Sequence, residues 1–270
     1  MARGYDENSI RQQVRKLLKA NPHLFYTDKI VNYRGTTTDQ GTPYSEVIAD
    51  ELTKNFRILS TMENNVSIRK TKSFKLNHQG KPNVDARLDR FNKLTFSEKL
   101  LAIALFNSEK RFGFGKIFDY QVPLKEKQKQ KFGEIDLVAI DNSVIKLIEL
   151  KINVSNDETL LRALIEIYTY YRLINGSLEK FIKDYKFENQ QEFYFQTCIV
   201  TDQNALSGKT LHNLKDFPCI VKLMNTMKIE TGIPIELYTY DYPSHDIKYR
   251  SKGDTHIDLV GDIVFKRIEI

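Results

Sequence analysis

Residues 132–152 read FGEIDLVAIDNSVIKLIELKI and consist of two apolar segments separated by a short polar one. The polar segment, Asp141-Asn142-Ser143, is a typical turn sequence, and aliphatic residues dominate on both sides of it. We therefore predict an antiparallel hairpin with strands over 132–140 and 144–152. Because both strands are apolar on both faces, we expect other elements to cover the hairpin from both sides.

The expected register of this hairpin gathers four charged residues. If the loop has two residues, Asp136 lies opposite Glu149 and Glu134 lies opposite Lys151. Directly opposed residues share a face of the sheet, so the four side chains meet near one end of the hairpin. Charged groups among apolar residues are costly unless they are paired or bound to metal. Two interpretations stay open: cross-strand salt bridges, above all between Glu134 and Lys151, or a site for Mg²⁺, which takes hard oxygen ligands.

The two charged segments, 133–136 and 148–151, resemble the sequence motif of the PD-(D/E)xK nuclease superfamily. The resemblance covers about residues 96–200. Ile135 stands where the motif name has proline, a position at which many members also lack proline. The motif is short, and its place on two hydrophobic strands joined by a tight turn makes it more specific.

This resemblance implies a catalytic site. Asp136 and Glu149 would bind Mg²⁺, for which Mn²⁺ could substitute, and the backbone carbonyl of Leu150 would complete the coordination. Lys151 would orient or deprotonate the attacking water. Many members carry a further acidic residue on the preceding helix, and Glu98 is the matching catalytic residue and metal ligand here. The segment 95–98 also matches a capping box, which explains Glu98 equally well.

A helix expected over 157–174 carries the polar residues Arg162, Glu166 and Tyr170 at four-residue spacing. Some superfamily members have a Gln-xxx-Tyr pair near the active site on this helix, and Glu166 with Tyr170 is similar, with Glu in place of Gln. Together with Glu134, these two residues are expected to support the site. An ordinary ion pair between Arg162 and Glu166 explains the polar stripe equally well.

Two basic stretches are candidates for nucleic-acid binding. Lysines alternate just before the first hairpin strand and would share one side of an extended arm, and a second basic group lies between residues 69 and 75. The residues expected to contact phosphates are Arg69, Lys70, Lys72, Lys75, Lys127, Lys129 and Lys131. Solvated loops explain both stretches equally well. The formal net charge of +6 suits a polyanionic partner without establishing one.

The remaining periodic segments predict the architecture around the hairpin. Helices are expected over 7–20, from 43 onward, over 96–106 and 157–174, and between Pro218 and Gly232; strands are expected over 116–125, 193–200 and 235–240. This order predicts an α/β fold with a restriction-endonuclease-like mixed central sheet flanked by helices. We divide the chain into a helical, basic N-terminal region, 1–90, which is a candidate for engaging substrate, and a nuclease core, 91–270.

Composition excludes several classes of protein. With 270 residues, 41% hydrophobic and 28% charged, the chain matches an ordinary globular protein that buries a core. No apolar run approaches the roughly 18 residues of a membrane helix, and the polar N-terminus does not resemble a signal peptide. Cys198 and Cys219 form no CxxC motif, so we expect reduced thiols, a cytoplasmic location and no membrane partner.

Together these features predict an Mg²⁺-dependent phosphodiesterase, a deoxyribonuclease and most simply an endonuclease, with DNA favoured over RNA as the partner. A homodimer would suit double-strand cutting. One alternative is a non-catalytic nucleic-acid-binding or scaffold protein on the same fold, and another is a different metal-dependent hydrolase. The intact set of Asp136, Glu149 and Lys151 favours catalysis. Restriction, repair and defence all remain open as biological roles.

Overall fold

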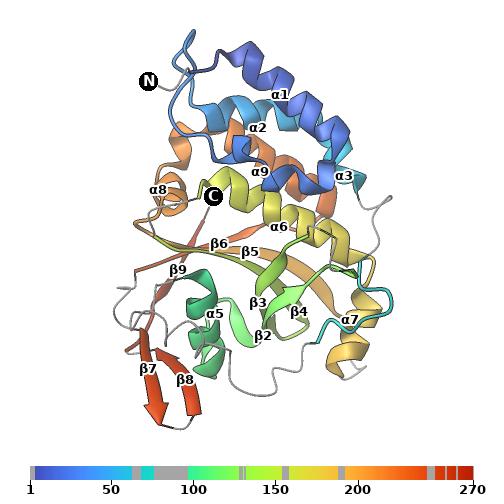
Figure 1. Cartoon of the computed structure of the whole chain (residues 1–270), viewed down its shortest axis with the longest axis vertical. Helices are drawn as coiled ribbons and strands as arrows, with labels where there is room; N and C mark the ends of the chain where they lie inside the picture. Colours follow the sequence, from blue (N-terminus) through green and yellow to red (C-terminus); the bar gives the residue numbers. More distant parts are fainter. Residues whose placement is uncertain are drawn as a thin grey trace.

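A seven-stranded mixed sheet forms the centre of the protein, with helices on both faces (Figure 1). The computed structural model describes residues 4–62, 68–75, 97–127, 130, 132–153, 158–187, 192–241, 247–252, 254–259 and 261–269. The strand order is β1-β2-β3-β4-β5-β6-β9. Its strands are β1 (Arg111–Phe112), β2 (Gly115–Pro123), β3 (Glu134–Asp141), β4 (Val144–Lys151), β5 (Tyr194–Asp202), β6 (Glu236–Tyr240) and β9 (Phe265–Ile268). The fold class is therefore mixed α/β, as expected.

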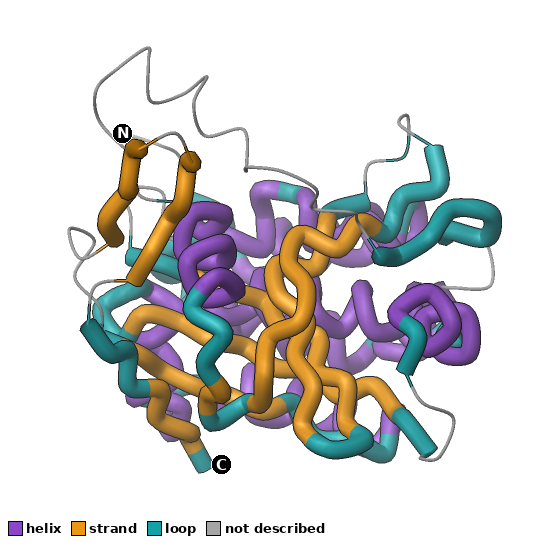
Figure 2. The backbone as a smooth tube through the Cα atoms, turned by 90° about the horizontal axis from the view of Figure 1, so that it is seen from below, coloured by secondary structure: helices purple, strands orange, loops and turns teal. Residues whose placement is uncertain are grey.

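The helices surround this sheet in layers. They are α1 (Glu7–Ala20), α2 (Tyr44–Lys54), α3 (Phe56–Ser60), α5 (Glu98–Asn107), α6 (Leu160–Asn175), α7 (Leu178–Tyr185), α8 (Leu206–His212) and α9 (Pro218–Thr231). Helices α6 and α9 cover one face, with α1 and α2 packed outside them, and α5 covers the other face (Figure 1). A separate two-stranded hairpin, β7 (Ile247–Lys252) with β8 (Asp254–Leu259), stands apart from the large sheet and contacts α5 (Figure 2). None of the helices in the described parts of the chain is long and apolar enough to cross a membrane.

The predicted hairpin is present as β3 and β4. Asp141 pairs with Val144, and the same register continues to the pair Leu137 with Ile148. Asn142 provides the left-handed residue of the turn, with φ of 55°. Apolar side chains on the two faces of the hairpin belong to two different core clusters, one under α6 and one under α5. The expectation that the hairpin is buried on both sides is confirmed.

Beyond Leu137 the two hairpin strands stop pairing with each other. β3 continues against β2 as far as Glu134, and β4 continues against β5 as far as Lys151. The Leu150 N–H instead donates to the Asp136 carboxylate, 3.0 Å away. The expected opposed pairs, Asp136 with Glu149 and Glu134 with Lys151, do not occur. The Leu150 N–H bonds to the side chain of Asp136 and not to the backbone of β3.

The N-terminal helices share the core of the sheet. Ile10, Val14 and Leu18 of α1 are completely buried and belong to the same apolar cluster as α6 and α9. Glu51 of α2 is buried and accepts hydrogen bonds from Arg15 of α1. The shorter of these bonds joins Arg15 Nε to Glu51 Oε1 and measures 2.6 Å. The boundary predicted near residue 90 lies outside the described residues.

Candidate active site

A cleft opens where β3 and β4 diverge, between the first turn of α5 and the start of α6. Six carboxylates line it: Glu98, Glu134, Asp136, Glu149, Glu158 and Glu166. Four cationic side chains also line it: Lys99, Lys125, Lys151 and Arg162. Carboxylates thus outnumber cations, and such an excess attracts a further positive charge.

Lys151 lies among the carboxylates of this cleft and is only 3% exposed. Its Nζ is 2.6 Å from both Glu149 Oε1 and Glu158 Oε2, 3.6 Å from Glu166 Oε2 and 3.7 Å from Glu98 Oε1. Burial alone would lower the pKa of Lys151. The attraction of the surrounding carboxylates, led by Glu149, outweighs burial and raises that pKa well above its usual value. Lys151 is therefore held as an ammonium ion.

Asp136 is anchored through both carboxylate oxygens. Oδ2 accepts the Leu150 N–H at 3.0 Å, and Oδ1 accepts from the Gln121 side-chain amide at 3.1 Å. Burial raises the pKa of Asp136 to about 8, and Glu98 adds to the rise while Lys151 opposes it. In an extended strand the N–H and C=O of one residue point the same way, so the Leu150 carbonyl also faces β3.

Glu149 carries an unsatisfied buried oxygen. The side chain is 2% exposed, and its Oε2 has no hydrogen-bond partner among the described residues. Burial, reinforced by Glu166, raises the pKa of Glu149 well above its usual value. A buried carboxylate oxygen without a donor is costly, and a divalent cation held by Asp136, Glu149 and the Leu150 carbonyl would relieve that cost.

The present arrangement is not a preformed metal cage. No group of three or more His, Cys, Asp or Glu side chains in the described part of the chain is spaced to hold a metal. Lys151 serves instead as the counter-cation of the carboxylates, through its contacts with Glu149 and Glu158. A cation at Glu149 would displace the Lys151 ammonium group, whose four-carbon stem is flexible.

Glu98 lines the cleft, but α5 begins at a later residue than the capping-box interpretation requires. Ser97 is the N-cap of α5, and its hydroxyl accepts the Leu100 N–H at 3.3 Å. Glu98 is therefore the first residue of the helix and not the third, so the capping-box explanation is wrong. Burial, the largest influence, raises the pKa of Glu98.

The pair Glu166 and Tyr170 lies at the wall of the cleft. The Tyr170 hydroxyl donates to Glu166 Oε1 at 2.7 Å. A Cβ atom at Gly133 would lie 1.9 Å from the Tyr170 hydroxyl oxygen, so glycine is required beside this tyrosine. Arg162 also lies near Glu166, at 3.6 Å, and closer to Glu158, at 3.0 Å. The ion pair and the Glu-Tyr pair, which both explain the polar stripe, are thus present together.

Glu134 lies at the rim of the cleft and pairs with Lys125, 3.5 Å away. The salt bridge expected between Glu134 and Lys151 is wrong, because the strands diverge before they reach this pair. The residues of the cleft that were not anticipated include Glu158, Gln121 and Lys99. Glu158 lines the cleft because it lies just before α6, which begins beside the cleft. Gln121 could have been found only from the pairing of β2 with β3.

The candidate phosphate-binding residues differ in exposure. Arg69 is 7% exposed and donates to the carbonyls of Ser73 and Lys125, so its position does not fit a phosphate contact. The exposed candidates are Lys70, Lys72, Lys75 and Lys127. Because Arg69 ties the segment 68–75 to Lys125, these lysines lie on the side of the molecule where Lys125 lines the cleft. Lys129 and Lys131 lie outside the described residues.

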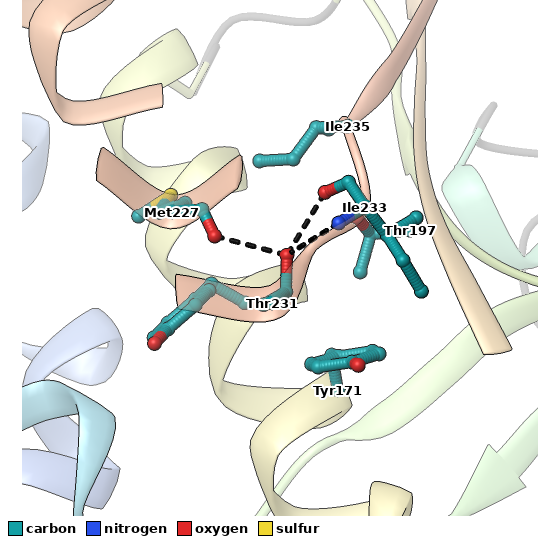
Figure 3. Close-up of a pocket in the computed structure, with 7 residues that line it drawn as sticks. Tyr171, Thr197, Met227, Thr231, Ile233 and Ile235 are labelled. Carbon is teal, nitrogen blue, oxygen red and sulfur yellow. Dashed lines mark hydrogen bonds between the residues drawn. The ribbon is translucent and has the colours of Figure 1, made fainter. Parts of the chain in front are cut away.

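A second, small pocket lies between α6, α9 and β5 (Figure 3). None of its lining residues is ionisable near neutral pH. Its most polar group, the Thr231 hydroxyl, lies 2.9 Å from the Met227 carbonyl and 3.2 Å from the Ile233 nitrogen (Figure 3). The pocket is lined by hydroxyl-bearing and apolar side chains, without a carboxylate, amine, imidazole or thiol.

Comparison with protein-family models, with curated proteins and with solved structures finds no match to this chain.

Proposed function

We propose that this chain is a metal-dependent nuclease with a restriction-endonuclease-like core, which hydrolyses phosphodiester bonds in DNA. The observation that carries the proposal is the convergence of Asp136, Glu149 and Lys151, with Glu98, in one cleft around an unsatisfied buried carboxylate oxygen. These are the residues that the PD-(D/E)xK resemblance singles out for catalysis.

The proposed roles follow from the geometry. Asp136, Glu149 and the Leu150 carbonyl offer hard oxygen ligands, and Glu98 offers a fourth from α5. A bound Mg²⁺ ion would stabilise negative charge on the phosphate and lower the pKa of a bound water. Hydrolysis forms a bond from the water oxygen to phosphorus, breaks the bond to the leaving sugar oxygen and delivers a proton to that oxygen. Lys151, whose Nζ lies 2.6 Å from Glu149, would orient or deprotonate the attacking water.

A purely structural role for the cluster is the main competitor. It would make the contact between Lys151 and Glu149 an ordinary buried ion pair on a scaffold or binding protein. Such a pair needs one carboxylate to balance one ammonium ion. Lys151 instead has four carboxylates within 4 Å, and three of their buried oxygens, one each on Glu149, Glu158 and Glu166, have no hydrogen-bond partner among the described residues. This excess is costly for stability alone and favours a functional site.

Exposed lysines beside the cleft favour a polyanionic substrate. Lys70, Lys72 and Lys75 lie in the segment 68–75, which Arg69 links to the backbone of Lys125, a residue of the cleft, and Lys127 follows Lys125 by two residues. The carboxylates within the cleft would repel a phosphate in the absence of a metal ion, so EDTA should weaken DNA binding as well as abolish cleavage. We assign DNA over RNA, internal cleavage and a homodimer for double-strand cutting as parts of the same proposal.

Mg²⁺-dependent degradation of plasmid and single-stranded DNA tests the proposal, with EDTA as the negative control. Lys151→Met should abolish cleavage while DNA binding survives. Lys146→Met is a matched control, since Lys146 is also a buried lysine of β4, with its Nζ 2.6 Å from Glu236, and it does not line the cleft. Asp136→Ala and Glu149→Ala should be inactive too, and double variants should be little worse than single ones. Full activity of Lys151→Met would overturn the proposal.

A further inference from the structure

The backbone of Gln121 in β2 adopts an unusual conformation. Its φ is 50°, in the left-handed region that non-glycine residues rarely occupy within strands. Tyr120 and Val122 on either side pair with Leu137 and Ile135 in one unbroken register. No residue is inserted between these pairs, so a β-bulge does not account for the positive φ. Conformations of this kind cost free energy and persist mainly where function requires them.

The strained backbone of Gln121 is accompanied by a hydrogen bond from its side chain to Asp136. Its amide donates to Asp136 Oδ1 at 3.1 Å, while the backbone N–H of Leu150 holds Oδ2 at 3.0 Å. An ionised carboxylate has about four acceptor positions, so two stay available after both contacts are made. The Asp136 carboxylate is thus held at both oxygens, and Gln121 and Asp136 both line the cleft.

We propose that Gln121 is a positioning residue that orients the Asp136 carboxylate for a divalent cation, at the expense of backbone strain in β2. This inference rests on the proposed function, because it needs a cation at Asp136. Partners that orient metal ligands typically change metal affinity by about 10–100-fold when they are removed. Glycine or asparagine would tolerate φ of 50° better, but glycine lacks the amide and asparagine is shorter by one methylene group.

Two variants separate the amide from the strain. Gln121→Gly removes both, and should leave the melting temperature of the metal-free protein unchanged or raise it by about 2–4 °C. Gln121→Met keeps the length of the side chain and the strained backbone, and removes only the amide group. Both should weaken Mn²⁺ binding about 10–100-fold, measured by calorimetry or by the electron paramagnetic resonance signal of free Mn²⁺. Gln196→Met is the control, since Gln196 is a buried strand glutamine outside the cleft whose amide reaches the Pro234 carbonyl at 3.4 Å.

The outcomes are distinct. Loss of Mn²⁺ affinity in both Gln121 variants, with wild-type affinity in Gln196→Met, supports the positioning role. Wild-type affinity in Gln121→Met overturns it, and so does a fall in melting temperature that leaves Mn²⁺ affinity intact, because Gln121 would then serve only the fold. If the wild-type protein binds Mn²⁺ and cleaves DNA, either of these results excludes the positioning role of Gln121 and leaves the proposed function in place. If the wild-type protein binds no Mn²⁺, the proposed function fails together with it.

Discussion

Replacing Asp136 by Asn should stabilise the metal-free protein and remove its response to Mg²⁺. Asp136 is 8% exposed, and burial raises its pKa to about 8 from an ordinary value of 3.8. At pH 7 the native protein must therefore either take up a proton at this residue or keep a buried charge, and both cost free energy. Asn is nearly isosteric and carries no charge. Its oxygen can accept the Leu150 N–H, and the Gln121 amide can flip to accept from its nitrogen.

The size of the effect follows from the shift in pKa. One pKa unit corresponds to about 1.36 kcal/mol, so the cost of Asp136 at pH 7 is at most about 4 kcal/mol. Relief of only about 1 kcal/mol raises the melting temperature by about 2–4 °C in a protein of this size. The native state binds the extra proton, so the wild-type protein loses stability relative to the variant as pH rises from about 4 to 8.

Mg²⁺ provides the second arm of the experiment. An ion present at 100 times its dissociation constant stabilises the wild-type protein by about 2.7 kcal/mol, or about 5–10 °C. Asp136→Asn should lose most of this increment. The assay is thermal melting of both proteins with Mg²⁺ and with EDTA. If Asp136 serves only as a charged acceptor for Leu150 and Gln121, Asn should instead destabilise the protein, by about 1.5–3 kcal/mol for each hydrogen bond removed, and Mg²⁺ should have no effect. That pair of results would refute our reasoning.

Three further predictions concern other parts of the molecule. Gly133→Ala should displace the buried Tyr170 ring, destabilise the fold by about 1–3 kcal/mol and reduce cleavage, as melting and nuclease assays would reveal; an unchanged protein would contradict the close approach of the two residues. Burial opposes the ionisation of Glu51, but its hydrogen bonds with Arg15 lower its pKa, so its contribution to stability is present above about pH 4.5 and is lost as pH falls. The stability gap between wild type and Glu51→Gln in urea should accordingly shrink towards pH 3, and a constant gap would argue against it. The exposed lysines of the segment 68–75 are Lys70, Lys72 and Lys75. Neutralising them should reduce the slope of log DNA affinity against log salt concentration by about 0.9 for each phosphate contact that is lost. An unchanged slope would show that these lysines do not contact DNA.

Local sequence determined the elements with strong periodicity and clear ends. The helix predicted over 7–20 has those ends, because Asp6 caps its first turn through the Ser9 N–H. α9 begins at Pro218 and ends before Gly232, which takes the left-handed conformation expected of a C-terminal glycine. The hairpin register likewise followed from a two-residue turn between apolar strands. Short elements, among them α7, α8, β1 and β7–β9, were not predicted, although α7 is strongly amphipathic.

The candidate site was predictable where its residues share one hairpin. Alternation along β3 and β4 is enough to place Asp136, Glu149 and Lys151 near one another, because neighbouring strands fix their relative positions within a few residues. The divergence of the strands could not be predicted, since the Asp136 side chain takes the Leu150 N–H while β2 and β5 hold the two strands from their outer edges.

Only the tertiary structure decided which distant residues complete the cleft. Glu158 reaches it from the residues just before α6, and Gln121 reaches it from β2. Arg69, expected to contact phosphate, is buried and donates to the Lys125 carbonyl beyond the end of β2. Sequence spacing constrains contacts over one helical turn or one hairpin. Contacts between elements separated by tens of residues depend on how helices and strands pack together, and that is set by the burial of the whole apolar core.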